Sequence, residues 1–296
     1  MHPYVLTVVL GAVCAGCLYG ALLKKKGLPV CAAPAALALG SGLGLVCARL
    51  GYCLLLFGMT FARYGFSALF HAQLHEFSFV TGAMGVCLGA ALGIRLCRCP
   101  VVRGMDVFAP ALALMAAFAR FGEYFLEWVG YGKYVDQPWQ QFFPLSVESP
   151  YGGWYTAVFM LEGLCALILA AVLTAMEKRH ERFLFTRAAF YLALPQIFWE
   201  SLRALTMKWG FVRIEQVLCG VIVTAFVAWH CLKCREGGLS RFWPVGGMLL
   251  CIAVMVGVEF ALDKTNISYI ICYGVMLLAL LGMAGLEIYS VRRRKA

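Results

Sequence analysis

Apolar residues along this chain fall into long stretches separated by short polar segments. Each stretch holds about 20 residues, the length that an α-helix needs to cross the hydrocarbon core of a bilayer. We therefore predict an all-α protein, a polytopic transmembrane helix bundle of about nine spans. Strict alternation of apolar and polar residues, typical of a membrane β-barrel, is not visible. The spans are expected at residues 3–23, 29–58, 78–97, 105–126, 154–176, 184–205, 214–232, 244–262 and 267–290.

Basic residues gather after every second expected span. With nine spans these groups share one side of the membrane, and the positive-inside rule makes that side the cytoplasm. We therefore expect the N-terminus outside and the C-terminus in the cytoplasm. No basic segment precedes the first apolar stretch, so we expect a retained helix, not a cleaved signal peptide. The groups are Lys24, Lys25 and Lys26; Arg95, Arg98 and Arg103; Lys178, Arg179, Arg182 and Arg187; Lys233, Arg235 and Arg241; and Arg292, Arg293, Arg294 and Lys295.

Two longer segments are expected on the outer side. Residues 59–77 mix aromatic and polar side chains, which is typical of an amphipathic segment at the membrane interface. Residues 128–153 combine aromatic residues with several glycines and prolines, which favours a structured outer loop over a further span.

Composition narrows the class of protein. Of the 296 residues, 62% are hydrophobic and 14% are charged, which leaves no room for a large soluble domain. The net charge of +10 comes from basic residues that gather after every second span, so membrane topology accounts for it. We therefore expect no nucleic-acid partner. Most of the 14 cysteines lie inside apolar stretches, where they act as small hydrophobic residues. We expect no cofactor and no metal, because the Cys231–Cys234 pair alone is weak evidence for a zinc or redox site.

Charged residues inside the apolar stretches are the candidates for chemistry. Arg120, Glu123 and Glu127 share one helix face at positions i, i+3 and i+7. Such charges are costly in lipid, so they mark either a functional site or a self-contained ion pair. Both interpretations stay open at this stage.

Further charged residues lie within or at the ends of other spans. Arginines gathered near one membrane depth favour an anionic partner such as a phospholipid phosphate, although each could instead pair with a glutamate. His71 and His75 are four residues apart and could seat a metal or simply face headgroups. The further charged residues are Arg49, Glu162, Glu200, Arg203, Glu259, Asp263 and Glu287.

Several short motifs recur in the order and spacing of one known family. The motifs are Ala48–Tyr52, Ser78–Phe79 with Gly82 and Gly85, Asp106–Pro110, Ala119–Gly122, Glu127–Trp128, Leu161–Gly163, Glu200–Arg203 and Glu215–Gln216. On these motifs the chain resembles the prolipoprotein diacylglyceryl transferases of bacterial inner membranes across residues 5–232. We accordingly expect a seven-helix core at residues 1–235 and two additional helices at 236–296.

The resemblance implies a reaction. Family members move a diacylglyceryl group from phosphatidylglycerol to the lipobox cysteine of a preprolipoprotein at the outer face of the membrane, and glycerol phosphate leaves. This implies phosphatidylglycerol or another anionic phospholipid and a preprolipoprotein as partners, and the inner membrane as location. The expected catalytic residues are Arg120, Glu123 and Glu200, and the expected substrate-binding residues are Arg49, Tyr52, Glu127, Glu162 and Arg203.

Three positions depart from the family pattern. Val80 stands where the family has histidine, and valine cannot take up a proton. Glu123 stands where the family has asparagine, and Gln196 where it has arginine. The alternative function is therefore a catalytically altered or inactive relative that binds phospholipid or lipoprotein. A small-molecule transporter is a third hypothesis, which the lack of an inverted repeat disfavours.

Overall fold

The computed structural model describes residues 2–71, 73–126, 129–150, 152–178, 183–210, 212–234, 239–264 and 268–295. It divides into two compact units, which we describe separately. Unit 1 comprises Met1–Ala189 with Leu202–Leu205, and unit 2 comprises Phe190–Ser201 with Thr206–Ala296. The boundary falls within one helix, whereas the expected boundary at residue 235 stays a prediction.

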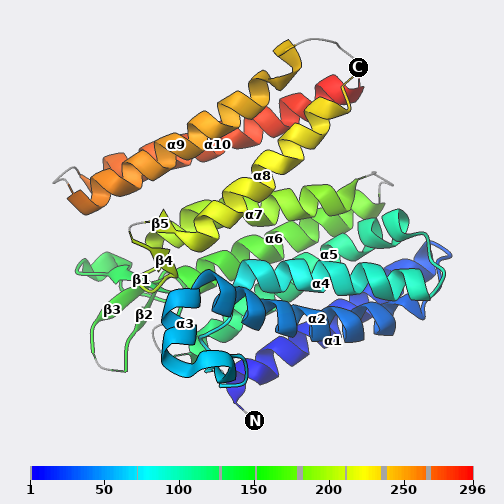
Figure 1. Ribbon diagram of the computed structural model, residues 1–296, viewed down its shortest axis with the longest axis horizontal. Coiled ribbons are helices and arrows are strands. Elements are labelled where there is room, and N and C mark those ends of the chain that lie inside the picture. Colours follow the sequence, from blue (N-terminus) through cyan, green and yellow to red (C-terminus); the bar gives the residue numbers. More distant parts are fainter. Residues whose placement is uncertain are drawn as a thin grey trace. The chain divides into compact units, whose positions relative to one another are not determined.

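Helices dominate both units (Figure 1). The α-helices are α1 (Pro3–Lys25), α2 (Ala32–Leu55), α3 (Phe57–Tyr64), α4 (Phe79–Leu96), α5 (Val101–Gly122), α6 (Val158–Lys178), α7 (Leu184–Leu202), α8 (Ile214–Leu232), α9 (Trp243–Lys264) and α10 (Tyr269–Lys295). Short 3-10 helices are η1 (Gly65–Leu69), η2 (Glu123–Phe125), η3 (Pro138–Gln140) and η4 (Leu239–Phe242). The strands are β1 (Tyr131–Tyr134), β2 (Ser146–Glu148), β3 (Trp154–Ala157), β4 (Lys208–Trp209) and β5 (Val212–Arg213).

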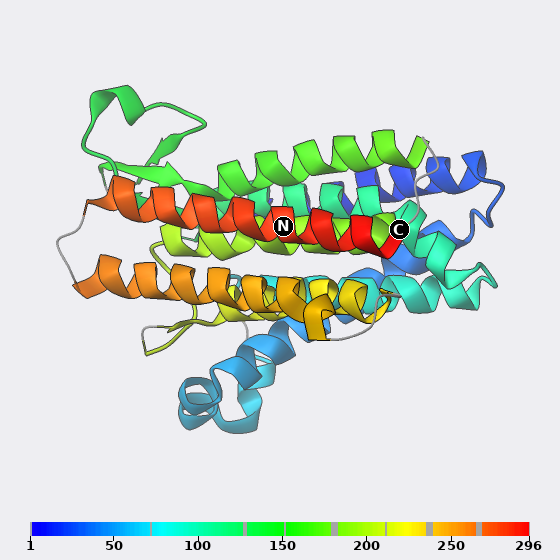
Figure 2. The ribbon, with the colours of Figure 1, turned by 90° about the horizontal axis from the view of Figure 1, so that it is seen from above.

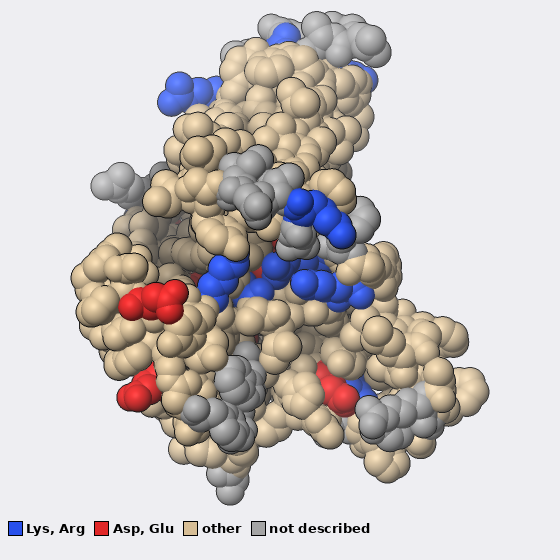
Figure 3. Space-filling model, turned by 90° about the vertical axis from the view of Figure 1, so that its left-hand side faces the viewer, with Lys and Arg blue, Asp and Glu red and all other residues tan. Residues whose placement is uncertain are grey.

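Within the described residues, eight helices are long and apolar enough to cross a membrane: α1, α2, α4, α5, α6, α8, α9 and α10. These confirm the predicted polytopic helical bundle. The expected span at residues 184–205, the sixth of the nine, forms α7, a helix of 19 residues that is not among the eight. Its apolar character is interrupted by Arg187, Pro195, Gln196 and Glu200. Figure 3 shows the end of the molecule that lies at the left of Figure 1, where uncharged residues cover most of the surface and a few Lys and Arg side chains gather near its middle.

In unit 1, α2 and α4 pack in close contact along their length (Figure 1). Glycines of α4 make this possible, because side chains there would collide with the α2 backbone. A Cβ atom added at Gly89 would lie 2.2 Å from the Leu39 carbonyl oxygen, and one at Gly93 would lie 2.6 Å from the Ala35 carbonyl oxygen. Small residues at four-residue spacing are typical of helix pairs in membranes.

Helices α1, α5 and α6 complete the helical core of unit 1. On α5, ten residues from Gly104 to Ala117 are buried, including the fully buried Phe108. The Phe108 ring meets the ring of Tyr19 on α1 edge to face, with centroids 5.2 Å apart. Lys26, which ends α1, forms a 2.8 Å ion pair with Glu177 near the end of α6. This ion pair therefore connects the end of α1 to the end of α6.

A small antiparallel sheet with strand order β1–β3–β2 begins in the expected outer loop, and its strand β3 takes up the first residues of the span expected at 154–176. Its core is formed by Tyr131, Val147, Ala157 and Phe159. Preceding it in the chain, the expected interfacial segment forms α3 and η1, which project beyond the end of α2 (Figure 2). Their exposed apolar side chains include Phe57, Met59 and Phe66. The interfacial position of residues 59–77 stays a prediction.

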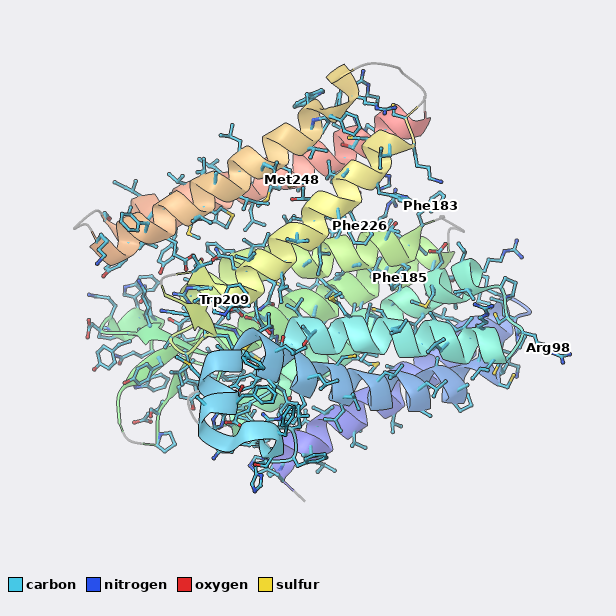
Figure 4. All side chains as sticks on the ribbon, in the orientation of Figure 1. Arg98, Phe183, Phe185, Trp209, Phe226 and Met248 are labelled. Carbon is cyan, nitrogen blue, oxygen red and sulfur yellow. The ribbon has the colours of Figure 1, made fainter. Side chains whose placement is uncertain are left out.

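In unit 2, α8, α9 and α10 pack through methionines. Met248 and Met255 on α9, and Met276 and Met283 on α10, are fully buried (Figure 4 labels Met248). Strands β4 and β5 form a hairpin that leads into α8, with Lys208 opposite Arg213. The hairpin carries Trp209, which is 56% exposed (Figure 4).

Candidate functional site

Three helix ends of unit 1 place charged side chains together. Helix α5 ends at Gly122, and Glu123 opens η2 directly after it. Glu162 lies in the second turn of α6, and Arg203 follows the last residue of α7. The Ala204 N–H donates a 2.8 Å hydrogen bond to the Tyr131 carbonyl of β1, which fixes the backbone next to Arg203.

Arg120, Glu123, Glu162 and Arg203 form what we call the ion network. Arg120 pairs with Glu123 through Nη1 and with Glu162 through Nε. Arg203 donates from Nη2 to Glu123 at 2.9 Å, and from Nε and Nη2 to the two oxygens of Glu162 at 2.8 Å. Each guanidinium therefore contacts both carboxylates, which closes the network.

Burial makes the ion network interdependent. Its four residues are between 3% and 7% exposed. Two guanidinium groups balance two carboxylates, so the group is formally neutral. Charges that are buried this deeply are stable only while each keeps its partner, because removal of one leaves another uncompensated. The self-contained Arg120–Glu123 pair considered from the sequence is thus part of a larger cluster.

Aromatic side chains complete the surroundings of Arg120. Its guanidinium lies 3.6 Å from the ring centroid of Phe79, on the first turn of α4. The ring of Tyr4 on α1 approaches Gly122, where an added Cβ atom would lie 3.0 Å from it. Phe79 lies within the quoted Ser78–Phe79 motif, but nothing in the sequence connected Tyr4 with Arg120, because the two residues are far apart in the chain.

A glycine leaves room for the carboxylate of Glu123. Gly130 has a φ of +77°, and a Cβ atom there would lie 2.5 Å from Glu123 Oε2 and 2.7 Å from the side chain of Phe159. Positive φ and close approach both favour glycine at this position. The start of β1 therefore packs directly against the ion network.

Arg49 holds a loop instead of joining this network. Its guanidinium donates to the Glu76 carbonyl at 2.9 Å, to the Glu76 carboxylate at 3.0 Å and to the His71 carbonyl at 2.7 Å, and it also donates to the Ala68 carbonyl. Tyr52 lies beside it, with the ring centroid 5.7 Å from the Arg49 guanidinium carbon. Their predicted substrate-binding roles stay predictions.

The comparisons with known proteins decide the family. The family model described as prolipoprotein diacylglyceryl transferase matches residues 1–232. The chain belongs to this family. The matched stretch covers α1 to α8 and ends at the last residue of α8, so α9 and α10 lie beyond it.

Two curated relatives carry the same printed name, phosphatidylglycerol–prolipoprotein diacylglyceryl transferase. The relative from Frankia alni is 27% identical over 199 residues, which cover 66% of this chain and 52% of that protein. The relative from Clostridium kluyveri is 29% identical over 138 residues, which cover 44% of this chain and 53% of that protein. The chain thus spans about half the length of the curated relatives it matches.

The positions that depart from the family pattern are buried. Val80 is 5% exposed and follows Phe79 in the first turn of α4, whose N-cap is Ser78. In unit 2, Gln196 is 5% exposed and donates a 2.9 Å hydrogen bond to the carboxylate of Glu200. The uncharged amide of Gln196 therefore donates a hydrogen bond to the Glu200 carboxylate at a position where the family pattern has an arginine.

The remaining candidates are placed as follows. Glu127 lies outside the described residues. His71 and His75 lie in a segment without helical structure, so the four-residue spacing does not place them on one helix face. Within the described part of the chain, no group of three or more His, Cys, Asp or Glu residues is arranged to hold a metal. Cys231 and Cys234 are both buried at the end of α8.

Proposed function

We propose that this protein is a membrane-embedded diacylglyceryl transferase. In this proposal it moves a diacylglyceryl group from phosphatidylglycerol, or another anionic phospholipid, to the lipobox cysteine of a preprolipoprotein. The family membership and the buried ion network support the proposal. We further propose that it acts at the outer face of the bacterial inner membrane.

Arg120 and Arg203 bind the lipid phosphate in this proposal. A guanidinium presents two parallel N–H donors, which match the oxygens of a phosphate. The cysteine thiolate attacks the glycerol carbon that carries the phosphate. An S–C bond forms, the C–O bond breaks, and glycerol phosphate leaves with the electron pair. The two arginines stabilise the negative charge that develops on the leaving phosphate.

Glu123 accepts the thiol proton in this proposal. Arg120 and Arg203 already neutralise its carboxylate, so it is a poor base in the closed ion network. A phosphate that binds beside Arg120 competes with Glu123 for the positive charge of the guanidinium. A carboxylate next to a second anion binds a proton more readily. Glu162 keeps Arg203 oriented through its bidentate contact. As the resemblance implies, Glu200 is a further catalytic residue in this proposal, and Arg49 and Tyr52 bind substrate.

The second candidate function is phospholipid or lipoprotein binding without turnover. Val80 and Gln196 favour it, because the side chains that the family pattern places there are absent. The closed ion network also fits a binding site that opens only for a headgroup.

Rescue of cells depleted of their own transferase tests the first function. We expect this chain to restore growth and lipoprotein maturation, and Arg120→Lys to abolish both, since lysine keeps the charge but loses the forked contact. Arg95→Ala, at an exposed basic residue near the end of α4, serves as the control and should behave like the unaltered chain. Absence of rescue at normal membrane levels would contradict the transferase proposal.

Lipid analysis of the purified protein separates the two functions. Retained phospholipid without product, unchanged in a Val80→His and Gln196→Arg double variant, would support the binding function. Product formed by the unaltered chain would exclude it.

A further inference from the structure

The last turn of α7 in unit 2 ends in carbonyl groups that receive side-chain donors. The final carbonyls of a helix have no partner within the helix. The Gln216 amide donates to the Ile197 carbonyl at 3.2 Å and to the Ser201 hydroxyl at 3.4 Å. Arg213 Nη1 donates to the Glu200 carbonyl and lies 3.4 Å from the Thr206 hydroxyl. Arg213, the residue before α8, therefore caps the carbonyl of Glu200 in the last turn of α7, and Gln216 of α8 contacts the preceding turn.

The charge of Arg213 is balanced from outside the stretch that the family model matches. Arg213 Nε forms an ion pair with Glu259 on α9, and the two side chains are 11% and 9% exposed. Residue 259 lies beyond the matched residues 1–232. A buried guanidinium without a counter-charge is strongly unfavourable. The carboxylate of Glu259 therefore offsets the charge of a buried cation at the end of α7.

The second added helix reaches the same turn. Tyr273 on α10 meets Phe198 on α7 edge to face, with ring centroids 6.1 Å apart. A separate contact joins α7 and α10 further along, where the Tyr191 hydroxyl donates to Glu287 at 3.1 Å. Both added helices therefore contact α7 or its capping residue, and α9 acts through Arg213 on the carbonyl of Glu200.

We propose that Glu259 is a positioning residue: through Arg213 it fixes the last turn of α7, which carries Glu200. The additional helices thereby help to hold the turn of unit 2 that carries Glu200. This inference rests on the proposed function only for the role of Glu200 in the reaction. Its structural content, the order of the α7 end, is independent of any activity.

Amide hydrogen exchange in lipid nanodiscs, without substrate, tests this content. In Glu259→Gln, we expect the amides of residues 198–202 to exchange roughly tenfold faster, since a hydrogen bond from a charged donor is lost or weakened. The matched control is Glu287→Gln, which alters a buried carboxylate that accepts a hydrogen bond from Tyr191 on α7. We expect no acceleration at residues 198–202 in the control. Equal acceleration in both variants would overturn the proposal.

A charge swap separates capping from simple ion pairing. The double variant Arg213→Glu with Glu259→Arg can re-form the ion pair, but a carboxylate cannot donate to the Glu200 carbonyl. We expect the melting temperature to recover relative to the single variants while residues 198–202 remain unprotected. Recovery of both would overturn the proposal. If Glu259→Gln does not fold, Glu259→Asp, which keeps the charge on a shorter side chain, should give a smaller acceleration of the same amides.

The outcomes also distinguish this inference from the proposed function. Protected amides in every variant, together with intact lipid transfer, refute the positioning role alone. Acceleration in Glu259→Gln, in a protein that never turns over lipid, refutes the transferase proposal alone. If the positioning role and the transferase proposal are both correct, the rate of lipid transfer should fall in Glu259→Gln and recover in part in Glu259→Asp.

Discussion

At the scale of single residues, sequence spacing identified only part of the ion network. Arg120 and Glu123 share one turn, so their pairing follows from positions i and i+3. The Arg203–Glu162 contact joins residues 41 positions apart, and no local rule predicts such a partner. The sequence therefore named all four residues as candidates but not their arrangement.

Replacing Glu162 by glutamine tests the interdependence of the ion network. The variant leaves two buried guanidinium groups with one carboxylate, so we expect it to lower the free energy of unfolding by about 3–5 kcal/mol. Thermal unfolding in detergent measures the change. Glu148→Gln on the exposed edge of the sheet is the control, with an expected effect within about 0.5 kcal/mol. Equal effects in the two variants would mean that the charges of the ion network are not coupled.

A pH prediction concerns the thiols between α4 and α5. A hydrogen bond with Cys31 raises the pKa of Cys97, and burial raises the pKa of Cys99. Because only the thiolate is nucleophilic, both thiols should be mostly protonated and slow to alkylate at neutral pH. The alkylation rate of Cys97, followed by mass spectrometry, should rise with a midpoint above that of an unstructured cysteine peptide. A midpoint at or below that of the peptide would contradict the assignment.

At the scale of elements, apolar length predicted the helices well, since each span is a local signal. The small sheet was missed, because its strands of three or four residues show too little alternation: β1 and β2 lie in a glycine- and proline-rich loop, and β3 was counted as the start of a span. The division between α2 and α3 lies at Leu56, slightly before the expected end of the span at residue 58, since the apolar stretch continues through Leu56. These failures arise where tertiary contacts decide the local conformation.

The packing of α2 against α4 gives a prediction at this scale. Gly89→Ala introduces a Cβ atom against the backbone of Leu39, and backbone cannot move aside as a flexible side chain can. We expect a loss of about 1–3 kcal/mol in unfolding free energy. Gly42→Ala on α2 is the control, because a Cβ atom there meets nothing within 4 Å. A stable Gly89→Ala protein would show that the two helices are not packed this closely.

At the scale of the whole molecule, the orientation in the membrane remains a prediction. Nine spans place the termini on opposite sides, whereas the eight helices found by length and composition would place them on the same side. The role of α7 decides between these topologies. The basic groups favour nine spans, with the C-terminus in the cytoplasm.

Reporter fusions test this orientation. We expect alkaline phosphatase to be active when fused at Trp139, in the outer loop, and inactive when fused at Arg98 or after Arg293. A fluorescent protein that matures only in the cytoplasm should give the opposite pattern. Matching activity at Trp139 and Arg293 would place both on one side and contradict the nine-span topology.

The most direct test of the central claim is lipid transfer by the purified protein. Nanodiscs with phosphatidylglycerol labelled in its terminal glycerol are mixed with a lipobox peptide, and released glycerol phosphate and the thioether peptide are measured. The account predicts both products in equal amounts, with the rate reduced on the order of a hundredfold or more in Arg120→Lys. Bound phosphatidylglycerol with neither product, from a folded protein, would contradict it.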